Sequence, residues 1–217
     1  MEINKIYNEN CLDTMSRMDD NFIDLSLTSP PYNMNLRINK GKYISRQIVK
    51  EFSTKYIGFN DNLPVDDFYK LHKKILTELL RVSKIVFYNF QIVTGSKRAF
   101  FKLMGDFNEH KVNEQPAMQY DVLNSRFEII LILGDNPISR KFNNSNFKRG
   151  ELSNLWSIKR GKKISKDHSA IFPEELVDNI INKFTKKGDL VYDCFAGTGT
   201  TAKVSVINKR KYIASEI

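Results

Sequence analysis

The stretch VYDCFAGTGTTA, residues 191–202, decides the fold of this chain. A short apolar run ends at Asp193, and Gly197 and Gly199 follow in a G-x-G-x-x-A spacing. Glycines at this spacing let the backbone approach a nucleotide closely, in a turn between a strand and a helix. By itself the spacing also fits an ordinary tight loop, and a dinucleotide-binding site is a further alternative.

The residues after this turn complete a nucleotide-binding unit. A helix-like stretch leads to a second strand at residues 211–214, and Glu216 follows where a carboxylate can hold ribose hydroxyls. The unit occupies about 25 residues, too few for a nucleotide-binding sheet of several strands. The remaining strands must come from the earlier chain. The sequence therefore predicts an α/β fold with a doubly wound, mostly parallel, Rossmann-like sheet in circularly permuted order.

A second informative segment is LSLTSPPYN, residues 25–33. Ile23, Leu25 and Leu27 alternate as in a strand, which ends at the two prolines. Consecutive prolines fix their own φ angles and lack N–H donors, so carbonyls point outward from a rigid corner. Such a corner can accept hydrogen bonds from an amino group, and Tyr32 offers a flat face for stacking. A plain surface turn after a strand is the alternative.

Together, TSPPYN and DCFAGTGTTA resemble the two signature motifs of the amino-methylating DNA methyltransferases, which use S-adenosylmethionine. In one order of that family the catalytic motif comes first and the cofactor motif last, as in this chain. The resemblance spans nearly the whole sequence. It implies a seven-stranded methyltransferase sheet and a single domain over residues 1–217, of the kind found in restriction–modification systems.

The resemblance also implies which residues form the site. The implied catalytic residues are Ser29, Pro30, Pro31 and Tyr32. The implied cofactor-binding residues are Asn10, Cys11, Phe172, Pro173, Asp193, Phe195, Gly197, Thr198, Gly199, Thr200, Thr201 and Glu216.

Two departures from the family pattern stand out. Where relatives usually carry an acid before Cys-Leu, this chain has Asn10, whose amide oxygen can accept from an adenine amino group without charge assistance. The sequence also ends at Ile217, directly after the predicted ribose acid, where relatives usually continue with a helix. We expect some apolar strand surface to be exposed there unless another segment covers it.

The charge balance favours a polyanionic partner. The chain has 34 Lys and Arg against 25 Asp and Glu, a net charge of +9. The excess is concentrated in residues 137–166, where relatives usually house target recognition, and a solubilising loop is the alternative. The predicted DNA-binding residues are Arg140, Lys141, Lys148, Arg149, Lys159, Arg160, Lys162 and Lys163.

Other classes of protein find little support in the sequence. No apolar run approaches the roughly 18 residues of a membrane span, and no signal-peptide pattern is present, so a cytoplasmic protein is expected. Cys11 and Cys194 lack metal-site or disulfide-framework spacing, and no metal is expected. The expected partners are S-adenosylmethionine and double-stranded DNA with a flipped base. The sequence leaves the oligomeric state undecided, and a homodimer is one possibility.

The predicted activity is methyl transfer to the exocyclic amino group of a flipped base. Ser before Pro-Pro resembles cytosine-N4 enzymes slightly more than adenine-N6 enzymes. Two alternatives stay open. One is a catalytically silent nucleic-acid-binding relative. The other is a nicotinamide-dependent oxidoreductase, which would leave residues 28–32 and the basic segment unexplained.

The middle of the chain reads as scaffold. Apolar periodicity predicts helices over residues 65–80 and 174–184, and apolar runs predict strands over 84–90 and 127–133. Residues 34–62 are polar and are expected to form a loop beside the Pro-Pro corner, and a solvated linker is the equal alternative.

Overall fold

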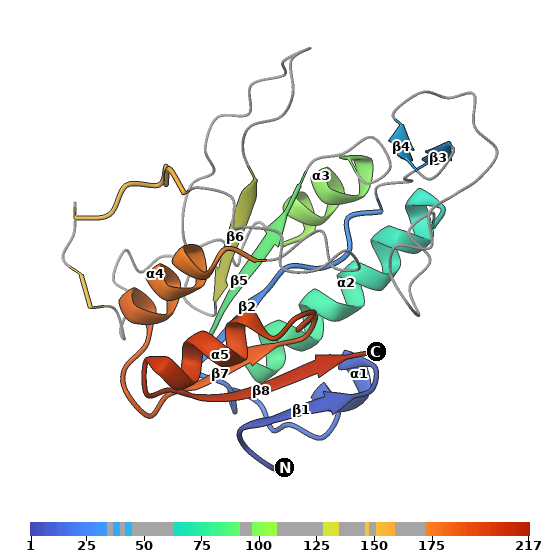
Figure 1. Cartoon of the computed structure of the whole chain (residues 1–217). Coiled ribbons are helices and arrows are strands. Elements are labelled where there is room, and N and C mark those ends of the chain that lie inside the picture. Colours follow the sequence, from blue (N-terminus) through green and yellow to red (C-terminus); the bar gives the residue numbers. More distant parts are fainter. Residues whose placement is uncertain are drawn as a thin grey trace.

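The computed structural model describes residues 1–33, 37–39, 42–44, 63–91, 97–107, 128–134, 146–147, 151–158 and 172–217. Six described strands form one sheet in the order β1-β8-β7-β2-β5-β6 (Figure 1). Their bounds are β1 Lys5–Asn8, β2 Leu25–Thr28, β5 Ile85–Phe90, β6 Ile129–Gly134, β7 Leu190–Asp193 and β8 Lys211–Glu216. Neighbours run parallel throughout, except that β6 is antiparallel to β5. The predicted mostly parallel α/β sheet is confirmed, whereas its circular permutation stays a prediction.

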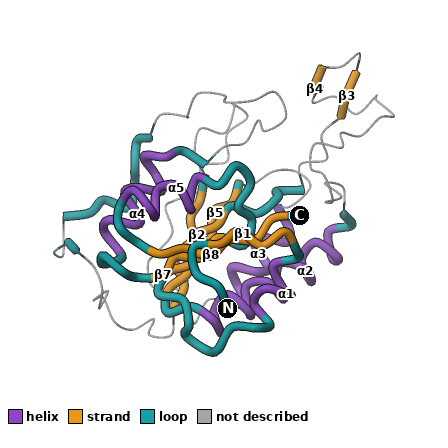
Figure 2. The backbone as a smooth tube through the Cα atoms, turned by 60° about the horizontal axis from the view of Figure 1, so that its bottom comes forward, coloured by secondary structure: helices purple, strands orange, loops and turns teal. Residues whose placement is uncertain are grey.

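Helices cover both faces of this sheet. Their bounds are α1 Cys11–Met15, α2 Val65–Val82, α3 Lys97–Asp106, α4 Glu174–Phe184 and α5 Thr200–Ile207. Figure 2 shows α4 and α5 on one side of the strands and α1, α2 and α3 on the other. The predicted helix over 174–184 is found with these bounds, and the one over 65–80 continues to Val82. No helix within the described ranges is long and apolar enough to cross a membrane.

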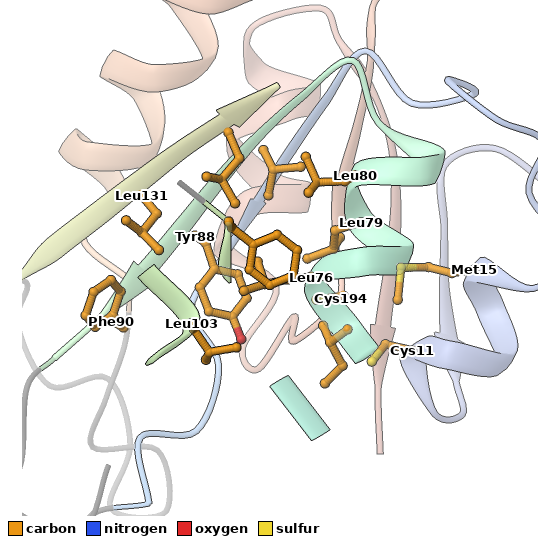
Figure 3. Packing of buried hydrophobic residues seen from close by; sticks show 14 of the residues in the cluster. Cys11, Met15, Leu76, Leu79, Leu80, Tyr88, Phe90, Leu103, Leu131 and Cys194 are labelled. Carbon is orange, nitrogen blue, oxygen red and sulfur yellow. The ribbon is translucent and has the colours of Figure 1, made fainter. Parts of the chain in front are cut away.

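Strand alternation divides the core into two parts. On β5, Val86, Tyr88 and Phe90 pack in the cluster that also contains residues of α1, α2 and α3 (Figure 3). Phe87, between them, packs with α4 on the opposite face. Because successive side chains of a strand point to opposite faces, an almost wholly apolar strand is the expected sequence for a sheet covered on both sides.

The order of the strands creates a switch in chain direction between β7 and β2. From β2 the chain proceeds through α2 to β5, while from β7 it proceeds through α5 to β8 in the opposite direction. Right-handed crossovers running in opposite directions place their helices on opposite faces of the sheet. The carboxyl ends of the two strands at such a switch border a crevice in which ligands bind.

Strand β1, which the sequence did not predict, covers the side of the sheet next to Glu216. It pairs with β8 in parallel, with Asn8 opposite Glu216. Ile213 and Ala214 of β8 are therefore buried, and Ile213 packs with residues of α1. At these residues another segment, the N-terminal one, covers the apolar strand surface, which is the exception that the sequence left open.

The region between β2 and α2 is only partly described. Two short antiparallel strands, β3 (Arg37–Asn39) and β4 (Lys42–Ile44), lie where the sequence suggested a loop. The other residues of the 34–62 segment lie outside the described residues.

Candidate active site

The two sequence motifs meet at the carboxyl ends of β2 and β7. Thr28, the last residue of β2, donates a hydrogen bond from its Oγ1 to Oδ1 of Asp193, the last residue of β7, over 2.9 Å. Residues 165 positions apart in the sequence are thus in direct contact. The Pro-Pro corner begins one residue after Thr28, and the glycine turn begins just after Asp193.

Asp193 organises the start of the glycine turn. Its side chain is 3% exposed. Oδ1 also accepts from the Phe195 N–H at 3.1 Å, and Oδ2 accepts from the Thr201 hydroxyl at 2.6 Å. Burial raises the pKa of Asp193 to about 6, while the hydrogen bonds from Thr201, Phe195 and Thr28 oppose that rise. Asp193 and Thr201, both predicted to bind cofactor, are buried against each other and hold the turn in shape.

The turn itself needs its glycines. Gly197 has φ of 51° and Gly199 has φ of 79°, in the left-handed region that favours glycine. The Gly199 N–H donates to the Ala196 carbonyl at 2.8 Å, and Gly199 precedes the first residue of α5. A Cβ on Gly197 would meet no other atom within 4 Å. The space beside the turn is therefore open, as a nucleotide-like ligand would require.

Glu216 lies against this turn from the neighbouring strand. Its Oε2 accepts from the Gly197 N–H at 2.7 Å, and its side chain is partly exposed. Asn10 lies two residues beyond the end of β1, the strand on the other side of β8. Its Oδ1 accepts from the Leu12 N–H at 2.9 Å and so caps α1. The residues expected at the ribose and the adenine thus lie beside adjacent strand ends.

The other predicted cofactor residues surround the same turn less closely. Cys11 is buried, and its carbonyl accepts from the Tyr192 hydroxyl at 3.5 Å. Thr198 and Thr200 lie in the turn with their hydroxyl oxygens 3.5 Å apart, and Phe195 is partly buried against the core. Phe172 packs on the α4 face of the sheet and Pro173 precedes α4.

An ion pair brings that end of α4 to the turn. Lys203 Nζ in α5 lies 2.6 Å from Oε1 of Glu174, the first residue of α4. Phe172 and Pro173, which come just before Glu174, are therefore held near the first turn of α5.

The Pro-Pro corner carries its own polar contacts. Ser29 Oγ and the Tyr32 hydroxyl are 2.8 Å apart, and both prolines are buried. The Tyr32 ring is only 7% exposed, so stacking on a base would require this ring or its cover to move. The stacking role stays a prediction.

Asn33 fixes the chain directly after the corner. Its φ is 54°, a conformation that Asn tolerates better than most residues. Its Nδ2 donates to the Leu63 carbonyl at 2.9 Å and its Oδ1 accepts from the Leu63 N–H at 2.8 Å. The backbone at Leu63 is thereby held beside the corner.

Sequence reasoning missed two residues of the corner, Asn89 and Glu128. Asn89, on β5, donates from Nδ2 to Tyr32 OH at 2.9 Å and to Glu128 Oε2 at 2.8 Å. Glu128 comes immediately before β6. The available signal was polarity: an Asn inside KIVFYNF and a Glu at the start of EIILIL interrupt otherwise apolar runs, and buried polar groups are costly without a partner or a role.

All eight predicted DNA-binding residues lie outside the described residues. Parts of the same segment are described, and they pack against α4. Asn146 bonds to backbone atoms of Asn182, Lys183 and Thr185, and the Phe147 ring contacts Phe184. Apolar residues of 151–158 pack on the same face. The packed residues are Leu152, Trp156 and Ile158, whereas Leu155 is exposed.

With the geometry established, comparison with known proteins identifies the family. Residues 23–217 match the N6/N4 DNA methylase family. The chain belongs to that DNA methylase family. The match covers both motifs and most of the described sheet.

Individual members of the family are similar to this DNA methylase over different lengths. The orphan methyltransferase M.BamHII of Bacillus amyloliquefaciens is 46% identical over 74 residues, which cover 31% of this chain and 28% of that protein. The type II methyltransferase M.BglII of Bacillus subtilis is 24% identical over 257 residues, covering 99% of this chain and 66% of that protein. This chain thus spans less than two thirds of the length of either relative.

Solved structures share the fold of this DNA methylase. The PvuII DNA methyltransferase, described as cytosine-N4-specific, superposes with a TM-score of 0.68 at 16% identity, over 98% of this chain and 81% of that one. M1.HpyAVI in complex with SAM (S-adenosylmethionine) gives a TM-score of 0.56 at 17% identity, over 98% and 92% of the two chains.

Proposed function

We propose that the protein transfers a methyl group from S-adenosylmethionine to the exocyclic amino group of a base flipped out of double-stranded DNA. The observation that carries this proposal is the Thr28–Asp193 hydrogen bond of 2.9 Å. It joins a corner suited to an amino group to a turn suited to a nucleotide, at the switch point of the sheet. Membership in the DNA methylase family supports the same reaction and leaves the oxidoreductase alternative without support of its own.

The residues of the turn fit the cofactor. Gly197 leaves open space, and Glu216 places a partly exposed carboxylate beside it. In the proposal Glu216 holds the ribose hydroxyls, Asn10 contacts the adenine, and Phe195 with Gly197–Thr200 surrounds the methionine part. S-adenosylmethionine, when bound, supplies an activated methyl group on a sulfonium ion. The known complex of M1.HpyAVI with this cofactor supports the assignment at the level of fold.

The corner has to make a poor nucleophile reactive. The lone pair of an amino group on an aromatic ring is delocalised into the ring. Hydrogen bonds from its N–H groups to Ser29 Oγ and the Pro30 carbonyl would favour a tetrahedral nitrogen with a localised lone pair. Most of the rate enhancement would come from positioning, which can be worth about 7–11 kcal/mol. Neither cysteine is needed as a nucleophile, and both are buried.

Cytosine N4 is slightly favoured over adenine N6 as the acceptor. Ser29 precedes the prolines in this chain, and family members with this serine more often resemble the cytosine-N4 enzymes. The cytosine-N4-specific PvuII enzyme has a similar fold, which agrees with this choice without deciding it, because both target classes share the family.

In the proposal the basic segment over 137–166 binds the DNA. Its cations would neutralise phosphates and offset the few kcal/mol that extruding a base costs. Replacing Lys162 and Lys163 by Glu should weaken DNA binding and reduce its dependence on salt, with no effect on cofactor affinity.

One experiment tests the reaction and the target together. The full chain is incubated with methyl-labelled S-adenosylmethionine and genomic DNA from a host without N4 or N6 methylation, and the DNA is digested to nucleosides. Label in N4-methyldeoxycytidine identifies cytosine as the target base, and label in N6-methyldeoxyadenosine identifies adenine. Ser29→Ala is the control that should transfer label about 100-fold more slowly.

A catalytically silent DNA-binding relative is the second candidate. The burial of Tyr32 and the neutral Asn10 in place of an acid favour it. This candidate predicts DNA binding without labelled nucleosides, whereas the enzyme predicts both.

A further inference from the structure

A polar cluster of four side chains lies at the Pro-Pro corner, drawn from three parts of the chain. We define the corner cluster as Ser29, Tyr32, Asn89 and Glu128. Asn89 is its centre, because its Nδ2 lies 2.8 Å from Glu128 Oε2, 2.9 Å from Tyr32 OH and 3.3 Å from Ser29 Oγ. Asn89 is 1% exposed, and its Oδ1 has no hydrogen-bond partner among the described residues.

This arrangement is unfavourable for stability alone. A buried amide oxygen without a partner costs free energy, and an apolar residue on β5 would avoid that cost. The neighbouring positions on β5, Tyr88 and Phe90, are indeed large and buried in the core. A polar residue retained between them calls for a role in the site.

Donor and acceptor chemistry gives the cluster a single direction. A carboxylate only accepts, so the NH2 half of Asn89 must face Glu128. One of its two hydrogens goes to Glu128 and the other to Tyr32, the two nearest oxygens. The Tyr32 hydroxyl and Ser29 Oγ are 2.8 Å apart and either could donate; since Glu128 Oε2 is 3.5 Å from the Tyr32 hydroxyl, we assign the Tyr32 hydrogen to Ser29 Oγ.

Ser29, the last residue in this series of hydrogen bonds, can therefore both accept from and donate to a base. Ser29 Oγ accepts from Tyr32 with one lone pair and keeps the other, together with its own hydrogen. It can accept from an amino group and donate to a ring nitrogen beside it. Both cytosine and adenine carry an amino group next to an acceptor ring nitrogen on their Watson–Crick edge.

We propose that Glu128 and Asn89 are positioning residues for methyl transfer: they orient the Tyr32 hydroxyl, and through it the lone pair and hydrogen that Ser29 presents to the target base. This inference rests on the proposed function. It extends that function by two residues that neither motif contains.

The variants separate hydrogen bonding from mere packing. Glu128→Ala removes the acceptor that orients Asn89, whereas Glu128→Gln keeps an amide oxygen that can accept the same hydrogen. Asn89→Ala removes the centre of the cluster. Glu175→Ala, on the exposed first turn of α4, is the matched control. Glu128 is itself exposed, so its variants should fold even where Asn89→Ala does not.

The first measurement is methyl transfer to unmethylated genomic DNA at saturating S-adenosylmethionine, with cofactor affinity determined separately by calorimetry. Glu128→Ala should lower turnover about tenfold, the value of one hydrogen bond, while cofactor affinity stays within about twofold. Glu128→Gln should recover most of that loss. Turnover of Glu128→Ala equal to that of the Glu175→Ala control would overturn the inference.

A second measurement does not depend on activity. Protein labelled with carbon-13 at the tyrosine ring carbon that bears the hydroxyl gives a Tyr32 signal, assigned with Tyr32→Phe. Glu128→Ala should move this signal, Glu128→Gln should move it less, and Glu175→Ala should leave it in place. If the unaltered protein transfers no methyl group, the proposed function fails, and this signal alone decides on the corner cluster. An unmoved signal in Glu128→Ala overturns it, and a moved one supports it.

Discussion

The glycine turn and the Pro-Pro corner lie side by side but are built differently. The turn is closed by bonds between its own residues and the adjoining strand, through Asp193, Glu216 and Ser215. The corner is held by single side chains from distant parts of the chain, and it leaves the amide oxygen of Asn89 without a described partner. A site for a constant cofactor can be fixed by backbone shape. A site for a reacting base depends on the placement of individual polar atoms.

The largest expected effects separate the two regions by the step they impair. Ser29→Ala should lower methyl transfer about 100-fold with unchanged S-adenosylmethionine affinity, since a lost acceptor in the reacting state costs that much.

Asp193→Ala should instead weaken cofactor affinity about 100-fold, because the turn loses three hydrogen bonds. Single-turnover kinetics and calorimetry check the two separately. If both variants impaired the same step, the division between the regions would be wrong.

The next effect concerns pH and belongs to the turn alone. Asp193 has a pKa of about 6 in the folded chain against 3.8 as its ordinary value. Between these values the folded state binds the proton that the unfolded state releases, so this group's contribution to stability falls as pH rises from about 4 to 6. The full amplitude is on the order of 3 kcal/mol.

Urea unfolding of the unaltered protein and of Asp193→Asn at a series of pH values measures this term. The stability of the unaltered protein should fall relative to the variant over that pH range. A difference that stays constant from pH 4 to pH 7 would show that Asp193 does not titrate in this way.

A smaller effect tests whether backbone shape defines the turn. Gly199→Ala places a side chain at φ of 79°, which should lower the free energy of unfolding by about 1–2 kcal/mol although space is available. Gly105→Ala in α3 is the matched control, because nothing lies within 4 Å of a Cβ added there. The free energy of unfolding of this variant should stay equal or rise by up to about 1 kcal/mol. Equal losses of unfolding free energy in both variants would show that the positive φ of Gly199 is not the cause.

The smallest effect concerns the bond between the two regions. Thr28→Val keeps the shape of the side chain but loses the donor to Asp193, at a cost of about 1 kcal/mol. Thr77→Val, at an exposed position on α2 where the hydroxyl donates to the Lys73 carbonyl of the same helix, is the control for the same exchange at the surface. A double-mutant cycle with Asp193→Ala, which removes the acceptor, measures the coupling in urea unfolding. A coupling of zero would mean that the regions are adjacent but energetically independent.

The same contrast explains what the sequence could predict. The glycine turn is a contiguous run whose chemistry can be read locally, and its strand, helix and acid are found in the predicted order. The Pro-Pro corner is half local: Ser29 and Tyr32 were predicted, whereas Asn89 and Glu128 were not.

The two missed residues depend on strand pairing. Asn89 reaches Glu128 because β5 and β6 are antiparallel, with Asn89 opposite Ile130 and Phe90 opposite Ile129. A shift of one residue would turn the side chains of one strand to the other face. Register of this kind is set by packing across the whole sheet, which a single sequence does not display. Strand β1 was missed for a related reason, since four residues carry too little periodicity to be recognised.

The paired hydrogen bonds between Asn33 and the Leu63 backbone have a consequence for how such a protein can diversify. They tie Asn33 to Leu63, so the two ends of the segment over residues 34–62 are held together beside the Pro-Pro corner. Lengthening the segment between these two residues costs little, because the entropic cost of loop closure grows only with the logarithm of the number of residues. An insertion or exchange between these two anchors should therefore leave Ser29 and Tyr32 where they are.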